Sequence, residues 1–508
     1  MKHLFFLLLV CPIFQLKAQQ YSPLTLEDKN MSNYLATHQP AKLSIQLKNA
    51  PDTVKNVPIK YSVVELGNGF GSTNHTGLDK NGRVEVTLGN NLAFQQVWLT
   101  VGDYLYVNVY VNTGLTVTID VQKATKGGAY TIGDGVVYSG DDGKLNIAMN
   151  QKNVFKKKER KQLLKNFDDL CRTRKKYDTS TFSFKVDSIY KQIDKIDNEF
   201  IASYPQYGWA IKNETASEVY SMLCIAYWND VMPDHFMRPM SNHKPFFTST
   251  SGAMFYRYLN TYTRWYGHPG KIHRLEKALA LSDSLYTQQK SDIEKLFFLE
   301  SERDTYTNSY PLIINSIKTG WCKRIAVDEL AKETANKKRI DSLFALSKKP
   351  ENANIGTPLF QLPFDANLYQ LDKTANIDEF ILSLKSKFAT KALIIDFWAT
   401  WCLPCLSDLP FSKALHEQNK DLPIEYIYLC TTSNSNMDLW KKKIADILLP
   451  GTHIFVDEMT LARLRTALSA EGGFPTYVVI DVNGKVSSKA ITRMQELDRT
   501  AVKNVIGL

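Results

Sequence analysis

The sequence predicts a multidomain fold with an N-terminal antiparallel β-sandwich, an all-helical middle domain and a C-terminal α/β domain. Its 508 residues are 44% hydrophobic and 22% charged, an ordinary globular composition with room for about three domains. Apolar residues alternate early in the chain, recur at helical spacing in the middle, and form separate strands and helices at the end. We place these domains at residues 19–143, 144–350 and 351–508, after a signal peptide at 1–18.

The first residues have the pattern of a secretory signal peptide. Lys2 precedes an apolar run over residues 4–14, and Ala18 ends a candidate cleavage site. The run is too short for a comfortable membrane span. Lipidation at Cys11 or an uncleaved anchor is the alternative, although Val10 is a poor residue before a lipidated cysteine. We therefore expect export to the periplasm or cell envelope.

The region 41–150 has the pattern of short strands. Apolar and polar residues alternate in 43–47, 84–88 and 117–121, and turn signals such as Asn81-Gly82 recur between such runs. This spacing predicts a sandwich of about seven or eight strands. The region contains no set of side chains with an obvious chemistry, so we expect an interaction or spacer module.

From about residue 144 the apolar period becomes helical, which predicts the middle domain. One clear stripe consists of Val186, Ile189, Ile193, Ile196 and Phe200. His268 and His273 are the nearest approach to a ligand pair, but no carboxylate or cysteine at ligand spacing accompanies them. We therefore expect no metal site.

The net charge of +10 is concentrated at the start of the middle domain. Residues 144–176 contain 12 Lys and Arg against 3 Asp and Glu, whereas residues 351–508 contain 16 against 18. The simplest interpretation of the basic helix 152–176 is a solvated face; the alternative is peripheral contact with anionic lipid. Export argues against nucleic acid as a partner.

The last domain alternates strands with helices. The expected elements, in order, are a hairpin over 359–371, a helix over 376–386, a strand over 392–398, a helix over 406–419, a strand over 424–430, a helix over 437–448, a strand over 453–456, a helix over 460–467, a hairpin over 477–488 and a helix over 496–506. Parallel strands with crossover helices and a terminal hairpin predict an α/β sandwich.

A pair of cysteines follows the apolar strand 392–398 and begins a helix. A strand running into Cys-x-x-Cys at a helix start is typical of a thiol–disulfide active site. Unpaired N–H groups and the helix dipole favour a thiolate on Cys402, the attacking group, while Cys405 is placed to resolve a mixed disulfide. Pro404 stiffens the turn between them.

Two acids are candidates for exchanging a proton with Cys405. Asp396 lies in the buried strand, where burial should raise its pKa. Asp408 lies one turn after Cys405, and its alternative is a solvent-facing position. Cys430 ends the next strand, where we expect a buried thiol rather than a third redox group.

These motifs resemble a known family. Residues 396–405 resemble the thioredoxin active site, and 401–410, Trp-Cys-Leu-Pro-Cys-Leu-Ser-Asp-Leu-Pro, resembles the TlpA/ResA-like branch. Gly473-Phe474-Pro475-Thr476 resembles the family's cis-proline loop. One departure is Leu406, where a basic residue is common. The resemblance implies a thioredoxin-like fold for the last domain.

The resemblance also implies a function. We expect an exported thiol–disulfide oxidoreductase that reduces protein disulfides, draws electrons from a membrane thiol donor, and needs no cofactor beyond the Cys402–Cys405 disulfide. Such proteins include those that act in cytochrome c maturation. The substrate-binding residues implied by the family are Trp401, Pro404, Phe474, Pro475 and Thr476. The alternatives are an envelope binding or scaffold protein with a regulatory dithiol and, with less support, a peroxide-reducing thiol enzyme. Pairing among Cys171, Cys224 and Cys322 stays open.

Overall fold

A computed structural model describes residues 28–508 except 51–56, 58, 65–72, 89–93, 125–131, 247, 268–273, 347, 349–353, 372, 374, 471 and 472. The predicted signal peptide, the pair His268 and His273, and the residues at the predicted domain boundary of 350/351 lie outside the described residues. The chain separates into two compact units, residues 1–330 and 331–508. In the described part, no helix is both long and apolar enough to cross a membrane.

The first unit begins with helix α1 (Asp28–Thr37) and two four-stranded sheets. One sheet has the order β4-β1-β7-β8 and the other β3-β2-β5-β6. Both contribute to one buried apolar cluster, which contains Ile45 of the first sheet and Leu99 of the second. The strands are β1 (Lys42–Lys48), β2 (Ile59–Val63), β3 (Thr73–Thr76), β4 (Arg83–Thr87), β5 (Gln96–Val101), β6 (Leu105–Tyr110), β7 (Gly114–Asp120) and β8 (Val136–Ser139).

One strand pair differs from the predicted antiparallel arrangement. β1 and β7 run parallel, with Leu43 opposite Leu115 and Ile45 opposite Val117. All the strands between them in sequence except β4 belong to the other sheet, so the chain returns to β1 by a long connection rather than a hairpin. Alternation of apolar residues predicts a half-buried strand but carries no information on its direction, which is why this part of the prediction was wrong.

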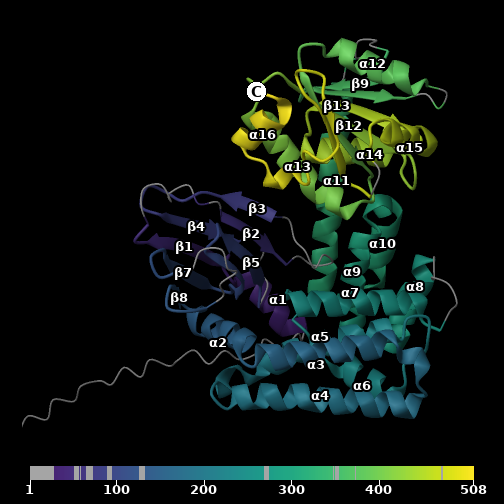
Figure 1. The fold of residues 1–508 in the computed structure, drawn as a ribbon. Helices are drawn as coiled ribbons and strands as arrows, with labels where there is room; N and C mark the ends of the chain where they lie inside the picture. Colours follow the sequence, from purple (N-terminus) through teal and green to yellow (C-terminus); the bar gives the residue numbers. More distant parts are fainter. Residues whose placement is uncertain are drawn as a thin grey trace, which may run out of the picture. The chain divides into compact units, whose positions relative to one another are not determined.

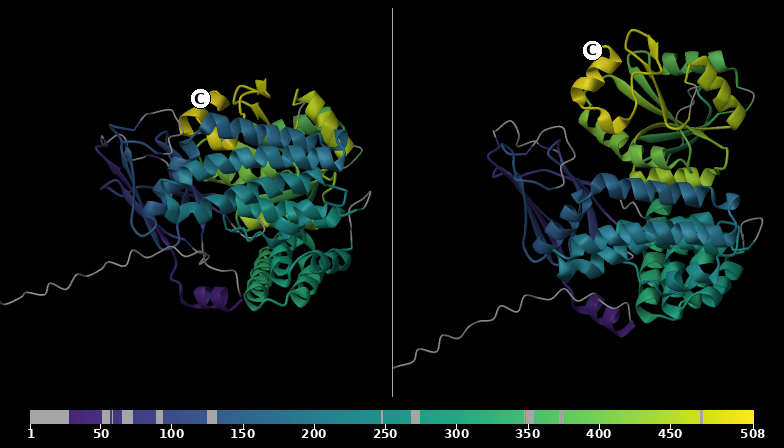
Figure 2. Two further views of the ribbon diagram at one scale, coloured as in Figure 1. Left: turned by 90° about the horizontal axis from the view of Figure 1, so that it is seen from below. Right: turned by 60° about the horizontal axis from the view of Figure 1, so that its bottom comes forward.

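Helices make up the rest of the first unit. They are α2 (Gly143–Val154), α3 (Lys157–Arg172), α4 (Thr179–Ile201), α5 (Gly208–Ala226), α6 (Asp234–Asn242), α7 (Thr250–Trp265), α8 (Leu275–Leu285), α9 (Gln288–Ser301), α10 (Tyr306–Ser316) and α11 (Gly320–Ala345), the last of which continues into the second unit. The two long helices α3 and α4 lie side by side (Figure 2). An ion pair between Lys156, before α3, and Glu199, near the end of α4, fits an antiparallel arrangement.

A buried carboxylate ties α2 to the strands. Asp142 precedes α2, and its side chain accepts hydrogen bonds from the backbone N–H groups of Asn112, Thr113 and Gly114 at 2.8, 2.9 and 3.0 Å. These residues form the connection in which the chain leaves one sheet for the other. The carboxylate therefore satisfies backbone donors that no strand partner satisfies at this crossing.

The second unit contains one seven-stranded sheet of order β15-β14-β11-β12-β13-β10-β9. Neighbours from β11 to β10 are parallel, and β14 and β9 join them antiparallel. The strands are β9 (Thr357–Leu362), β10 (Ala366–Gln370), β11 (Ala392–Trp398), β12 (Ile424–Thr431), β13 (Gly451–Val456), β14 (Thr476–Ile480) and β15 (Val486–Ser487). All seven residues of β11 are buried, as expected for a strand covered on both faces.

Helices cover both faces of this sheet (Figure 1). Apolar residues of α13 (Leu403–Gln418), α14 (Met437–Ile447) and α16 (Arg499–Ile506) share a buried cluster with one face. Residues of α12 (Ile377–Lys387) and α15 (Glu458–Ala467) share a cluster with the other. Asp498 caps α16, so the last helix begins later than the sequence pattern predicted.

The end of α11 also belongs to this unit. The Phe344 ring contacts the Phe360 ring of β9 edge-on at a centroid distance of 5.1 Å, and Glu333 pairs with Lys442 of α14 at 3.3 Å. The Arg339 guanidinium donates to the carbonyl oxygen of Ala445 at 3.0 Å. These contacts make residues 331–345 part of the cover over one face of the sheet.

We predict that Asp142→Ala lowers the free energy of unfolding of the first unit by about 2–4 kcal/mol, because three backbone N–H groups lose their acceptor in a buried place. Urea denaturation followed by circular dichroism measures the change. The matched control is Asp141→Ala, since Asp141 is the exposed neighbour and should change stability little. Equal effects of the two substitutions would contradict the role of Asp142.

Candidate active site

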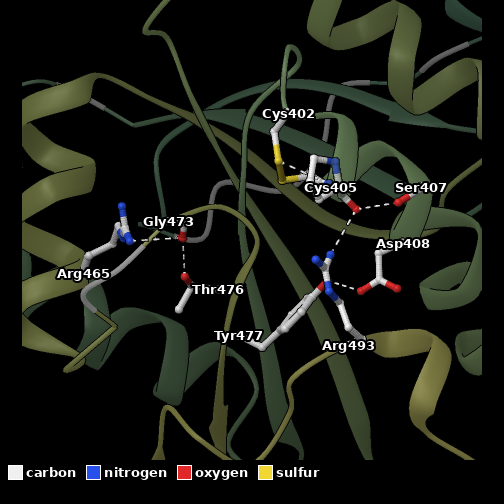
Figure 3. Close-up of a disulfide and its surroundings, with 10 residues drawn as sticks. Cys402, Cys405, Ser407, Asp408, Arg465, Gly473, Thr476, Tyr477 and Arg493 are labelled. Carbon is white, nitrogen blue, oxygen red and sulfur yellow. Dashed lines mark hydrogen bonds between the residues drawn. A yellow bond between two sulfur atoms is a disulfide. The ribbon is translucent and has the colours of Figure 1, made fainter. Parts of the chain in front are cut away.

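The cysteine pair lies where the central strand gives way to a helix. β11 ends at Trp398, and α13 begins at Leu403 with Cys402 as its N-cap. Cys402 and Cys405 form a disulfide (Figure 3). The Cys402 sulfur also accepts a hydrogen bond from the backbone N–H of Cys405 at 3.2 Å. The same N–H group would stabilise a thiolate on Cys402 in the reduced protein.

The disulfide is recessed, but apolar side chains beside it are exposed. Cys402 is 4% exposed and Cys405 1%, whereas Trp401 is 50% and Leu403 67% exposed. The Trp401 indole N–H donates to the carbonyl oxygen of Ser433 at 2.7 Å, which fixes the ring while leaving one side in solvent. A fixed, half-exposed aromatic ring beside a reactive disulfide suits contact with a partner protein.

A second loop reaches the same place from β14. The Phe474–Pro475 peptide bond is cis, and the Phe474 ring meets the Trp401 ring at a centroid distance of 5.9 Å. The Thr476 hydroxyl donates to the carbonyl oxygen of Gly473 at 2.6 Å, which closes the loop on itself (Figure 3). Because β14 pairs with β11, this loop is held at the end of the strand that leads to the cysteines.

Arg465 of α15 supports that loop from outside. Its guanidinium lies over the Phe474 ring at 4.9 Å from the centroid. It also donates to the carbonyl oxygen of Gly473 at 3.4 Å (Figure 3). A cation–π contact of this kind restricts the movement of the Phe474 ring. No local spacing in the sequence relates α15 to the proline loop, so Arg465 could not be predicted from the sequence.

Asp396 is buried beneath the active-site helix. Its neighbours two residues away in β11, Ile394 and Trp398, belong to the same apolar cluster as Cys402 and Cys405, so Asp396 points to the same face of the sheet. It is 2% exposed, and one carboxyl oxygen has no hydrogen-bond partner. Burial raises its pKa well above the ordinary value, and the negative charge of a second acid, described next, raises the pKa further.

That second acid, Asp408, is also buried rather than solvent-facing. At 3% exposure, its carboxylate accepts a hydrogen bond from the Tyr477 hydroxyl (Figure 3). It also accepts hydrogen bonds from the Met494 N–H at 2.8 Å and the Gln495 N–H at 3.2 Å. Burial, followed by the charge of Asp396 and the bond to Asp408, raises the pKa of Tyr477. The structure therefore gives Asp408 three donors and leaves Asp396 with an unsatisfied oxygen.

Arg493 joins the segment after β15 to the active-site turn. Its guanidinium donates to the carbonyl oxygen of Pro404 at 3.4 Å (Figure 3). Arg493 and Tyr477 were both missed by the sequence analysis. The only available signal was that Tyr477 lies two residues after Pro475 on a strand expected beside the cysteines.

The other cysteines among the described residues are buried. Cys430 is opposite Trp398 in the sheet and belongs to the cluster that contains the disulfide, but burial raises the pKa of its thiol. Burial likewise raises the pKa values of Cys171 and Cys224, and Cys322 is also buried. In the residues that the structure describes, no group of three or more His, Cys, Asp or Glu is placed to hold a metal ion.

We predict that Asp396→Asn changes how stability depends on pH. Between the ordinary pKa of an unfolded aspartate, about 4, and the raised pKa in the fold, the folded protein holds a proton that the unfolded chain has lost. Stability of the wild type should therefore fall as pH rises through this window, by up to about 1.4 kcal/mol per pH unit. The variant has no such proton and should gain stability relative to the wild type between about pH 5 and 8.

Urea denaturation of the oxidised protein at several pH values measures this difference. Asp378→Asn, at an exposed position in α12, is the control and should follow the wild type. A wild-type curve with no greater decline than that of Asp396→Asn would show that Asp396 ionises normally.

Comparisons with known proteins agree with this geometry. Residues 370–506 match the Redoxin family. Over 101 residues the chain is 29% identical to the thiol-disulfide oxidoreductase ResA of Bacillus cereus, a match that covers 20% of this chain and 55% of that protein. The chain thus spans about half the length of this curated relative.

Two solved structures also match the last domain. The thioredoxin domain of a thiol-disulfide oxidoreductase from Bacteroides vulgatus is 22% identical, with 24% of this chain and 83% of that chain covered and a TM-score of 0.21. A thiol:disulfide interchange protein from Chlorobium tepidum TLS is 24% identical, with 24% and 85% covered and a TM-score of 0.22. At these scores they add nothing to the assignment, which depends on the Redoxin match, the ResA relative and the motif residues. On these grounds, the C-terminal domain of this chain matches the Redoxin family and is similar to thioredoxin-like proteins of the TlpA/ResA kind.

Proposed function

We propose that this protein is an exported thiol–disulfide oxidoreductase that reduces disulfides in other proteins. The observation that supports it most directly is the Cys402–Cys405 disulfide at the start of α13, above a buried carboxyl group with an unsatisfied oxygen. Such a dithiol can exchange with a substrate disulfide, and the buried acid can take up or return the proton that the exchange requires.

The reaction begins from the reduced protein. The Cys402 thiolate attacks one sulfur of the substrate disulfide; a Cys402–substrate disulfide forms, the substrate's own bond breaks, and its second sulfur leaves as a thiolate. The N–H groups at the start of α13 stabilise the attacking thiolate. Cys402 is the less buried of the two cysteines, which favours it as the attacking group.

Cys405 then resolves the mixed disulfide. Its thiol gives a proton to the Asp396 carboxylate and attacks the Cys402 sulfur, so the Cys402–Cys405 bond forms, the Cys402–substrate bond breaks, and the substrate sulfur that was bound to Cys402 leaves as a thiolate. Two electrons pass from the protein dithiol to the substrate, and the protein reaches the disulfide state of the structure. A raised pKa lets Asp396 hold this proton near neutral pH.

Asp408 acts differently in this scheme. Because three donors occupy its carboxylate, we assign it to positioning: it links α13 to Tyr477 and to the segment at Met494. Its charge also raises the pKa of Asp396, so it acts on the proton exchange through that residue.

The substrate binds in an extended conformation across the disulfide. The Trp401 and Phe474 rings provide the apolar contacts, and backbone groups next to Pro475 pair with the substrate chain. Pro404 and Thr476 shape the two segments that meet there: the Pro404 carbonyl oxygen accepts a hydrogen bond from Arg493, and the Thr476 hydroxyl donates one to the carbonyl oxygen of Gly473.

Turnover in the reducing direction needs an electron source outside the cytosol. The signal peptide predicted at 1–18 supports a location in the periplasm or cell envelope, where a membrane thiol donor would return the disulfide to the dithiol. Substrates such as apocytochrome c would fit this location. No cofactor besides the disulfide enters the scheme.

We predict that Cys402→Ser abolishes reduction of insulin disulfides in the presence of dithiothreitol, because the attacking sulfur is lost. Cys405→Ala should instead accumulate mixed disulfides on Cys402, since the resolving thiol is missing. Non-reducing gels and mass spectrometry of the trapped species measure this and identify the partners. Cys430→Ala, which removes a thiol on the same core face, is the control and should retain activity.

The same experiment separates catalysis from the competing function of an envelope scaffold with a regulatory dithiol. A folded Cys402→Ser protein with undiminished activity would refute the enzyme. A folded Cys405→Ala protein that traps no partner in periplasmic extract would refute turnover at this site.

A further inference from the structure

A basic hollow lies on the helical part of the first unit. Its lining residues belong largely to α3 and α5, two helices that pack side by side and are labelled in Figure 1. Its volume is about 540 Å³, within the range of small-molecule sites. Five of its lining residues are basic and two are acidic, Asp168 and Glu218. This site is separate from the disulfide and independent of the function proposed above.

Two of the basic residues form a fixed floor. Lys152, at the end of α2, is buried; its ammonium donates to the Thr215 hydroxyl at 3.2 Å and lies 3.9 Å from the Asp197 carboxylate. Arg160 of α3 pairs with Glu218 at 2.9 Å and lies 3.8 Å from Asp197. The positive charges of these two residues are thus balanced by the carboxylates of Asp197 and Glu218. The contacts fix both basic side chains at the bottom of the hollow without a ligand.

The rim carries the uncompensated charge. Lys157, Lys161 and Lys165 follow one another at four-residue intervals on α3, so they rise about 6 Å per step along one side of the helix. All three are exposed, and none forms an ion pair within the described residues. Asp168, the remaining acid in the lining, is paired with Arg172 at 2.7 Å.

We propose that this hollow binds phosphate groups, carried either by one soluble polyphosphate or by neighbouring anionic headgroups of a lipid surface. Three mobile ammonium groups in a row match several separated negative charges better than a single carboxylate, and lysine binds phosphate as a point charge. Leu164 and Met222 also line the hollow and offer an apolar surface beside the charges. A phospholipid headgroup with the start of its acyl chains and a soluble polyphosphate share this chemistry.

The test uses the full mature chain and two probes, inorganic tripolyphosphate and vesicles of phosphatidylcholine with or without phosphatidylglycerol. Calorimetric titration measures binding of tripolyphosphate, and co-sedimentation measures binding to the vesicles. The test variant is Lys157→Gln with Lys161→Gln and Lys165→Gln. The matched control is Lys158→Gln with Lys175→Gln and Lys176→Gln, which removes the same charge from exposed positions that do not line the hollow.

We expect the wild type to bind a probe at low salt, and we expect this binding to weaken as salt is added. The rim variant should bind at least about tenfold more weakly, and the control should change less than about twofold. Binding of tripolyphosphate alone would identify a soluble ligand, and binding of phosphatidylglycerol vesicles would identify a headgroup. Absence of binding by the wild type to either probe, or equal weakening in both variants, would overturn the proposal. Unchanged circular dichroism and disulfide reduction show that the variants are folded.

Discussion

Burial of the Asp396 carboxyl group is the constraint on which the active site depends. A carboxyl in an all-buried strand, with one oxygen lacking a hydrogen bond, costs free energy whenever it is ionised. The fold therefore keeps a proton on the face of the sheet that also carries the disulfide. A well-packed apolar residue at this position would remove that cost, so the cost itself indicates that the position serves chemistry rather than stability.

The second acid shows how a similar group can have a different role in the same layer. Asp408 is as deeply buried as Asp396, but a hydroxyl and two backbone N–H groups surround its carboxylate. One oxygen of the Asp396 carboxyl has no hydrogen-bond partner, whereas the Asp408 carboxylate accepts three hydrogen bonds. Environment, and not residue type, decides which of them exchanges a proton and which holds the segments around α13 together.

Local patterns in the sequence were sufficient to predict the residues at the centre of the active site. The strand, the cysteines and the helix that follows are contiguous, and the cis peptide bond at Pro475 lies in a short distinctive motif. The partners of Asp408 could not be predicted in this way, because Tyr477 and Met494 reach it from 69 and 86 residues further along the chain. The parallel pairing of β1 with β7 could not be predicted either. Strand direction depends on the long connection between the two strands, and alternation of apolar and polar residues carries no information about it.

The contacts at the end of α11 bear on how this protein can be divided. A boundary at residue 351 looks natural from the polar composition before the last domain, yet Glu333, Arg339 and Phe344 belong to the second unit. A fragment that begins at 351 would uncover the Phe360 ring and leave Lys442 without its carboxylate partner. A fragment that keeps these contacts of the redox domain therefore starts inside a helix, near residue 331, and work on the isolated domain should keep that last stretch of α11.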